Sequence, residues 1–104
     1  MTKTETKVYF FFNNNSSESL HTKFILSSVL GQNSKLLKIE YKEININEFP
    51  LMCDEYNIKR LPTTLIIQNE KIIDQISGEL KVGQVISIIK DIKYNLIKYK
   101  RETK

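Results

Sequence analysis

A chain of 104 residues can bury one core and is too short for two. Apolar residues make up 40% of it and charged residues 27%, a balance typical of a folded domain and not of a disordered one. The net charge is +4, and the whole excess lies in residues 90–104, because residues 1–89 carry ten basic and ten acidic side chains. A basic chain end complements a helix C-terminus, so it does not indicate nucleic-acid binding, which we do not expect.

The sequence contains no pattern typical of a membrane span, a secretion signal or a metal site. The apolar run Val8–Phe12 has only five residues, fewer than a signal peptide needs and far fewer than the roughly 18 of a transmembrane helix. One histidine, His21, and one cysteine, Cys53, make neither a ligand cluster nor an internal disulfide. We therefore expect a cytoplasmic protein that needs no cofactor.

The first predicted elements are a buried strand and a helix. Residues 1–7 are polar, and we expect them to be frayed or disordered. Val8–Phe12 is a continuous β-branched and aromatic run, which is typical of a central strand buried on both faces. Asn15 and Glu18 have the spacing of a capping box, and Gly31 is a natural helix end. The apolar stripe predicted for this helix is Leu20, Phe24, Leu26, Val29 and Leu30.

A second strand and a short helix follow. Within Leu36–Ile46, apolar and charged residues alternate, as in a strand near a sheet edge. Asn47 or a neighbour is expected to cap a short helix that tolerates Pro50 in its first turn. The buried face predicted for this helix holds Phe49, Met52, Cys53 and Tyr56, so Cys53 is expected to fill the core and not to react.

The C-terminal half predicts a hairpin and a helix. Pro62–Gln68 and Lys71–Ser77 are strand patterns joined by a turn at Asn69-Glu70, and Gly78 ends the hairpin. The last helix is expected to begin near residue 80 and to end near residue 98. Its inner face is predicted to hold Val82, Val85, Ile86, Ile89, Ile92 and Leu96.

The order of elements is therefore β-α-β-α-β-β-α. A βαβ crossover forces parallel strands and a hairpin forces an antiparallel pair, so the fold class is α/β, with a four-stranded mixed sheet and helices on both faces. This domain is expected to span residues 8–98, followed by a basic tail over residues 99–104.

Several of these segments resemble the thioredoxin family, over about residues 8–92. From Pro50 to Gly83 the match has no gaps, and it includes Tyr56-Asn57-Ile58, Leu61-Pro62-Thr63 and the Ser77-Gly78 turn. The resemblance implies a thioredoxin-like fold in which Pro62 is a cis-proline that faces the redox motif. Glutaredoxins are a poorer match, because Ser77-Gly78-Glu79 does not resemble their glutathione-binding stretch.

The chemistry of thioredoxins is missing at the matching positions. Where the family has Cys-x-x-Cys, this chain has Ser16-Ser17-Glu18-Ser19, and thiol–disulfide exchange needs a thiolate and a sulfur leaving group. The buried aspartate of the family corresponds to Phe10, and the lysine that pairs with it corresponds to Glu43. Asn15 stands at the place of the family's tryptophan and Phe24 at that of its helix proline.

Two functions follow from this resemblance. The first is a redox-inactive adaptor or binding module that holds a protein or an extended peptide through the backbone of Leu61, a form of β-augmentation. The residues expected to form its groove are Ser16, Ser17, Leu61, Pro62, Thr63 and Gly78. The alternative is a thioredoxin-like thiol–disulfide oxidoreductase whose two active-site cysteines, at Ser16 and Ser19, have been replaced by serine.

Serine also has uses that need neither hypothesis. Ser16 and Ser17 suit a helix N-terminus, where serine satisfies free backbone amides. Ser17 and His21 lie four residues apart on one helix face and could pair as nucleophile and base. Because the sequence specifies no acidic residue to orient His21, we do not expect a hydrolase.

Overall fold

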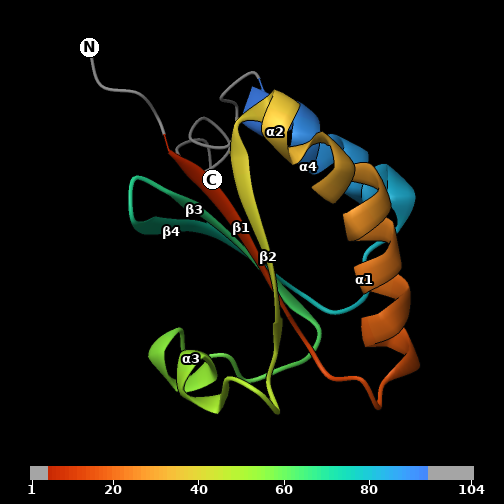
Figure 1. Ribbon diagram of the computed structural model, residues 1–104, viewed down its shortest axis with the longest axis vertical. Helices are drawn as coiled ribbons and strands as arrows, with labels where there is room; N and C mark the ends of the chain where they lie inside the picture. The colour runs from red at the N-terminus through yellow and green to blue at the C-terminus, as the bar shows by residue number, and fades with distance from the viewer. Residues whose placement is uncertain (1–4, 94–104) are drawn as a thin grey trace.

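Strand β1 (Thr6–Phe12) lies inside a four-stranded sheet with the order β2-β1-β3-β4. The computed structural model describes residues 5–93 (Figure 1). β1 begins two residues earlier than predicted, because Thr6 is paired with both Ile39 and Gln68 on the neighbouring strands. Lys7, which we expected to be frayed, is therefore part of the sheet.

The neighbours of β1 make the sheet mixed, as predicted. β2 (Ile39–Asn45) runs parallel to β1 at one edge, and β3 (Thr63–Gln68) runs antiparallel to it on the other side. β4 (Lys71–Ser77) is antiparallel to β3 and forms the second edge. Asn69 and Glu70 in the turn between them both have positive φ, 51° and 68°, which is the backbone of a type I′ hairpin.

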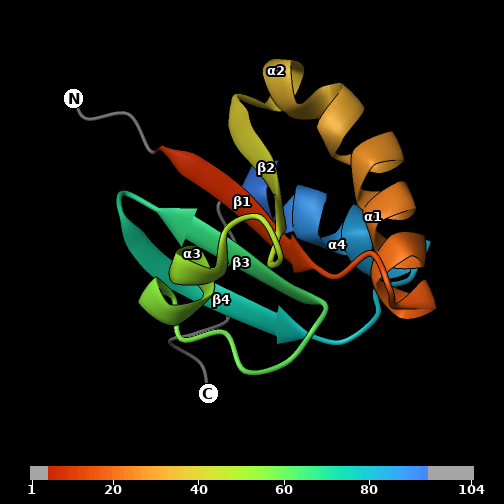
Figure 2. The ribbon, with the colours of Figure 1, turned by 60° about the horizontal axis from the view of Figure 1, so that its bottom comes forward.

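Helices cover both faces of the sheet (Figures 1 and 2). α1 (Ser17–Val29) and α4 (Val82–Lys93) lie on one face, and the short helix α3 (Pro50–Glu55) lies on the other. The predicted end of the last helix, its inner residue Leu96 and the basic tail lie outside the described residues.

The aromatic run of β1 separates two apolar clusters, since successive side chains point to opposite faces. Val8, Phe10 and Phe12 face α1 and α4, whereas Tyr9 and Phe11 face α3. All five are buried. A strand covered on both faces explains why this run is continuously apolar.

The inner face of α1 differs from the predicted stripe. Leu20 and Phe24 are 43% and 68% exposed, and the residues that face the sheet include Ser19 and Thr22. Ser19 and Thr22 were not predicted to be buried, because the prediction considered only apolar residues and these two are polar residues that are buried with hydrogen bonds. Val82 and Ile86 of α4 are likewise half-exposed, and Ile88 is buried in their place.

The segment between α1 and β2 also departs from prediction. A 3-10 turn, η1 (Gly31–Asn33), and a short helix, α2 (Ser34–Leu37), occupy it, so Leu36 and Leu37 are helical and not part of a strand. Gly31 is not a left-handed cap, because α1 ends on Leu30 in right-handed geometry. A Cβ there would lie 3.3 Å from the ring of Tyr41, a tight contact that the ring would have to relieve by a small shift.

The start of α3 differs as well. Its N-cap position is Phe49, which makes no side-chain capping bond, so Asn47 does not cap the helix as predicted. Phe49 is 51% exposed, so it does not belong to the buried face as predicted. Pro50 occupies the first turn as predicted. Met52, Cys53 and Tyr56 pack against the second apolar cluster.

Candidate functional site

The link between β1 and α1 is built from serine hydrogen bonds. Ser16 is the N-cap of α1, and its Oγ accepts the backbone N–H of Ser19 at 3.2 Å. Ser19 is fully buried, and its Oγ accepts the N–H of Asn13 at 3.3 Å. The cap is therefore Ser16 and not Asn15, whose own N–H donates to the side chain of Asn13. The two serines at the matching cysteine positions hold this turn together.

Ser17 is the first residue of α1 and is exposed. Four residues later, Nδ1 of His21 lies 2.5 Å from Oε2 of Glu79, in the link between β4 and α4. The acidic partner absent from the sequence pattern is thus supplied by a residue 58 positions away. Within residues 5–93, however, no hydrogen bond joins Ser17 to His21, so the described geometry does not assemble a nucleophile–base pair.

The loop before β3 brings Leu61, Pro62, Thr63 and Gly78 together. The Leu61–Pro62 peptide bond is cis. The N–H of Gly78 donates to the carbonyl of Pro62 at 2.7 Å, and the hydroxyl of Thr63 donates to the carbonyl of Arg60. Pro62, Thr63 and Gly78 are buried. These bonds fix the loop against the end of β4.

Leu61 is the part of this loop whose backbone is left available. It lies outside the strand ladder, which begins at Thr63. Among the described residues, neither its N–H nor its carbonyl has a hydrogen-bond partner, and its side chain is half-exposed. One donor and one acceptor therefore stand next to the buried Pro62.

Arg60 contributes a charge that we did not predict. Gly78 has φ of +99°, and a Cβ built there would lie 3.7 Å from a terminal nitrogen of Arg60, so the guanidinium lies beside this glycine. Arg60 forms no ion pair within residues 5–93. Its position directly before Leu61-Pro62 was the signal in the sequence, but only the fold shows that the side chain turns toward Gly78.

Thr22 is a second residue that the sequence analysis missed. It is fully buried, and its Oγ1 accepts the N–H of Leu80 at 3.1 Å. This bond ties α1 to the link that follows Gly78. Figure 2 shows the link from β1 to α1 and the link from β4 to α4 meeting at the start of α1. Ser16, Ser17, Pro62 and Gly78 thus belong to elements that converge at one end of the sheet.

Cys53 lies on α3 and is half-buried against the cluster of Tyr9 and Phe11. Burial, and then the charge of Asp54, raise the pKa of its thiol above the ordinary value of 9.0. Less thiolate is available at neutral pH than in a free cysteine, which makes Cys53 a poor nucleophile. Its packing agrees with the predicted core role.

Within the described part of the chain, no group of three or more metal-ligating side chains comes together. No helix among residues 5–93 combines the length and apolarity required to cross a membrane.

No family model and no curated protein matches this sequence. Solved structures do match. A thioredoxin of Malassezia sympodialis (Mala s 13) is 15% identical, with a TM-score of 0.74 over 86% of this chain and 76% of its own. Chloroplastic thioredoxin z is 22% identical, with a TM-score of 0.71 over 86% and 80%. The thioredoxin Deadhead of Drosophila melanogaster is 13% identical, with a TM-score of 0.72 over 84% and 80%. Together with the sheet order and its helical layers, these likenesses show that the chain has the thioredoxin fold.

Proposed function

We propose that this chain is a redox-inactive binding protein that holds an extended peptide segment of a partner beside Pro62. The observation that carries the proposal is the unpaired backbone of Leu61, next to a proline whose carbonyl is already bonded to Gly78. A peptide lying along Leu61 in β conformation would pair with the free donor and acceptor, as in β-augmentation. Ser17 and Thr63 belong to the elements that border this groove.

Arg60 supports a preference within the groove. Its guanidinium lies beside Gly78 and has no acidic partner in the described structure. Guanidinium groups bind carboxylates through two parallel hydrogen bonds. A peptide with Asp or Glu beside the residue that pairs with Leu61 is therefore the best match. Glu79 does not compete for Arg60, because its carboxylate is in contact with His21.

The absence of redox activity is supported by the atoms present. Ser16 Oγ and Ser19 Oγ accept backbone hydrogen bonds and cannot form a mixed disulfide. Cys53 is alone and has a raised pKa. We expect no disulfide reduction in a dithiothreitol-coupled insulin assay beyond that of a Cys53→Ser variant. Activity above this control would contradict the proposal.

The binding test starts from a peptide selected against the immobilised chain from a random-sequence library and then resynthesised as the probe. Ser17→Trp places a large side chain at the groove border without removing the cap made by Ser16, and it should abolish binding. Leu51→Trp is the matched control, because Leu51 is 79% exposed on α3. Equal affinity of the two variants would show that the peptide binds elsewhere.

Backbone pairing has its own test. N-methylation of the single peptide residue that faces Leu61 should weaken binding about two- to tenfold, the effect of losing one ordinary hydrogen bond. Methylation two residues further along should have less effect, because the N–H there does not pair with the backbone of Leu61. An affinity that ignores N-methylation at every position would refute β-augmentation.

The charge preference is tested by Arg60→Gln, with Lys59→Gln as the neighbouring exposed control. We expect Arg60→Gln to weaken acidic peptides by about two- to fivefold, as for a partly exposed ion pair, and to leave the same peptide with Gln in place of the acid unchanged. Equal losses in both variants would show non-specific attraction.

The oxidoreductase alternative predicts a different result. Ser16→Cys together with Ser19→Cys should then create disulfide-exchange activity. An intact fold without activity would favour the binding role.

A further inference from the structure

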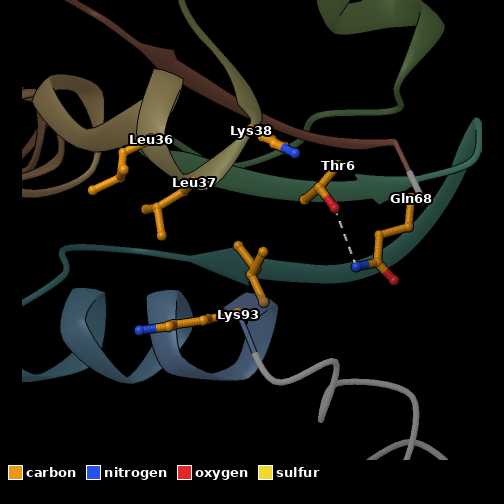
Figure 3. Close-up of a pocket in the computed structure, with 7 residues that line it drawn as sticks. Thr6, Leu36, Leu37, Lys38, Gln68 and Lys93 are labelled. Atoms are coloured by element: carbon orange, nitrogen blue, oxygen red, sulfur yellow. Dashed lines mark hydrogen bonds between the residues drawn. The ribbon is translucent and has the colours of Figure 1, made fainter. Parts of the chain in front are cut away.

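Two adjoining cavities lie at the end of the sheet away from Pro62, where β1 begins and β3 ends. The larger, of about 590 Å³, is lined by residues from α2, β1, β3 and α4, among them Thr6, Leu36, Leu37, Lys38, Gln68 and Lys93 (Figure 3). The smaller, of about 340 Å³, shares Leu36, Leu37 and Lys93 with it and continues between α1 and α4. Because three residues line both, we call the two cavities together the α2–α4 groove.

The lining of the α2–α4 groove changes along its length. The larger cavity has a polar side, where Nε2 of Gln68 donates to Oγ1 of Thr6 at 3.3 Å, and two lysines, Lys38 and Lys93. The smaller cavity is mainly apolar, with Val29, Ile86 and Ile89 in its wall, and its polar lining residues are Asn33, Lys90 and Lys93. No acidic side chain lines either cavity among the described residues. Each cavity thus has two lysines in its lining, and the larger one differs by the polar pair Gln68 and Thr6.

Lys38 provides an independent observation. It has φ 58° and ψ 45°, the left-handed conformation, and its N–H closes α2 by bonding to the carbonyls of Ser34 and Lys35. Helices that end in this way usually carry glycine, because a Cβ is unfavourable there. Lysine at this position therefore gives a lower free energy of unfolding than glycine would. Residues in such conformations cluster at sites that bind ligands, and Lys38 lines the larger cavity (Figure 3).

Leu36 provides another observation. It is 83% exposed although it is a large apolar residue, and it lines both cavities. Exposed leucines that stand alone need no explanation. Leu36 does not stand alone, because Leu37, Ile86 and Ile89 are in the same lining. An apolar chain lying along this wall would remove that surface from water.

We propose that the α2–α4 groove binds a fatty carboxylate, with the carboxylate in the larger cavity near Lys38 and the hydrocarbon chain running past Leu36 and Leu37 into the smaller one. The volumes fall in the range of about 300–1,000 Å³ found for small-molecule sites, which are mostly apolar with a few converging polar groups. Lysines line both cavities and no acidic side chain among the described residues does, which matches a negative head group and disfavours a positive one. The polar pair Gln68 and Thr6 favours the larger cavity for that head group.

Decanoate is the probe, titrated into the full ¹⁵N-labelled chain and followed by amide chemical shifts. We expect saturable shifts at Leu37, Lys38 and Gln68 and none at Leu61 or Thr63. Decyltrimethylammonium, with the same tail length and the opposite charge, should bind at least about tenfold more weakly. Shifts confined to the Pro62 end, or equal binding of both amphiphiles, would overturn the proposal. Neither result bears on peptide binding.

Matched variants locate the two ends of the ligand. Lys38→Gln should weaken decanoate about two- to fivefold, the range of one partly exposed charge pair, whereas Lys35→Gln, in the same helix but outside the lining, should not. Leu36→Asp should abolish binding, and Leu51→Asp, at 79% exposure on α3, should leave it unchanged. Equal effects within either pair would overturn the assignment.

One rival occupant is the chain itself. If the full chain fails to bind decanoate while a chain ending at Lys93 binds it, residues 94–104 fill the groove in its place and the proposal is wrong. If both forms bind with the same pattern of shifts, the fatty carboxylate remains the occupant.

Discussion

Each end of the sheet has a residue with left-handed backbone geometry beside its candidate site, but the residue type differs between the two ends. Beside Pro62, the left-handed position is occupied by Gly78, with φ of +99°, and beside the α2–α4 groove it is occupied by Lys38, with φ of 58°. Glycine adopts this conformation at no steric cost, and lysine does not. The left-handed backbone beside Pro62 therefore adds no steric strain, whereas the left-handed backbone of Lys38 lowers the free energy of unfolding.

The two ends also differ in what holds them. At the Pro62 end, four hydrogen bonds hold together three segments of the chain, residues 13–22, 60–63 and 78–80: Asn13–Ser19, Thr22–Leu80, Thr63–Arg60 and Gly78–Pro62. At the other end, the side-chain bond between Gln68 and Thr6 connects β1 and β3, Glu5 and Asn69 are joined by two further hydrogen bonds, and apolar side chains line most of the adjoining groove. The first end is suited to presenting fixed polar groups and the second to enclosing an apolar chain.

The largest effect is expected from Thr22→Val. The change keeps the shape but leaves the buried N–H of Leu80 without an acceptor, which should lower the free energy of unfolding by about 1–3 kcal/mol. Urea denaturation followed by circular dichroism measures it. Because Thr22 ties α1 to the link after Gly78, affinity for the selected peptide should fall as well, while decanoate binding should not.

Thr64→Val is the control for that change. Thr64 is equally buried, but its hydroxyl has no hydrogen-bond partner among the described residues. Replacing an unsatisfied buried hydroxyl with a methyl group should leave stability unchanged or raise it by about 1 kcal/mol. Equal destabilisation by both variants would show that the Thr22 bond contributes nothing specific.

The next effect concerns Gly78→Ala. A Cβ at φ of +99° is strained, so the free energy of unfolding should fall by about 1–2 kcal/mol. Gly83→Ala is the matched control, since Gly83 lies in α4 with nothing within 4 Å of the added Cβ, and it should gain up to about 1 kcal/mol from helix propensity. Thermal denaturation of the two variants in parallel measures both. A loss of stability in Gly78→Ala with a gain in Gly83→Ala would support the requirement for glycine at position 78, and changes of the same sign would contradict it.

A smaller effect of opposite direction is expected from Lys38→Gly. Relief of the left-handed lysine should raise the free energy of unfolding by about 1 kcal/mol and weaken decanoate binding. Glu70→Gly, at φ of 68° in the hairpin turn, is the control. It should gain similar stability without any loss of binding. A Lys38→Gly protein that is stabilised and still binds decanoate normally would show that the strained Lys38 is not required for binding.

The smallest effect tests the strands that join the two ends. The hydroxyl of Tyr9 donates to Glu40, and burial, followed by the charge of Glu40, raises the pKa of Tyr9 from 10.0 to about 12. Burial and Glu43 raise the pKa of Tyr41 as well. The folded state therefore holds these protons more tightly than the unfolded state, so stability is fully present below pH 10 and falls as the pH rises through about 12. Tyr9→Phe should reduce this fall, measured by urea denaturation between pH 9 and 12, and an unchanged slope would contradict the pKa shift.

The local pattern of the sequence was sufficient for the order of the elements along the chain and for a mixed four-stranded sheet. Val8–Phe12 had the pattern of a strand covered on both faces, the alternation within Leu36–Ile46 predicted a strand near an edge, and Asn69-Glu70 marked the hairpin. Such features depend on the periodicity of neighbouring residues, which the chain carries wherever it folds. The loop at Leu61-Pro62 and the serines before α1 were recognisable for a similar reason, as motifs of contiguous residues.

Only the tertiary structure decided which polar residues are buried and which distant residues meet. Thr22 is buried because Leu80, far along the chain, offers it an N–H, and Arg60 lies beside Gly78 because two links end at the same place. Lys38 became left-handed because Leu36 and Leu37 form a helix that must turn into β2 within one residue. Hydrogen bonds and cavities between separate segments depend on how the elements pack, and no local periodicity encodes that packing.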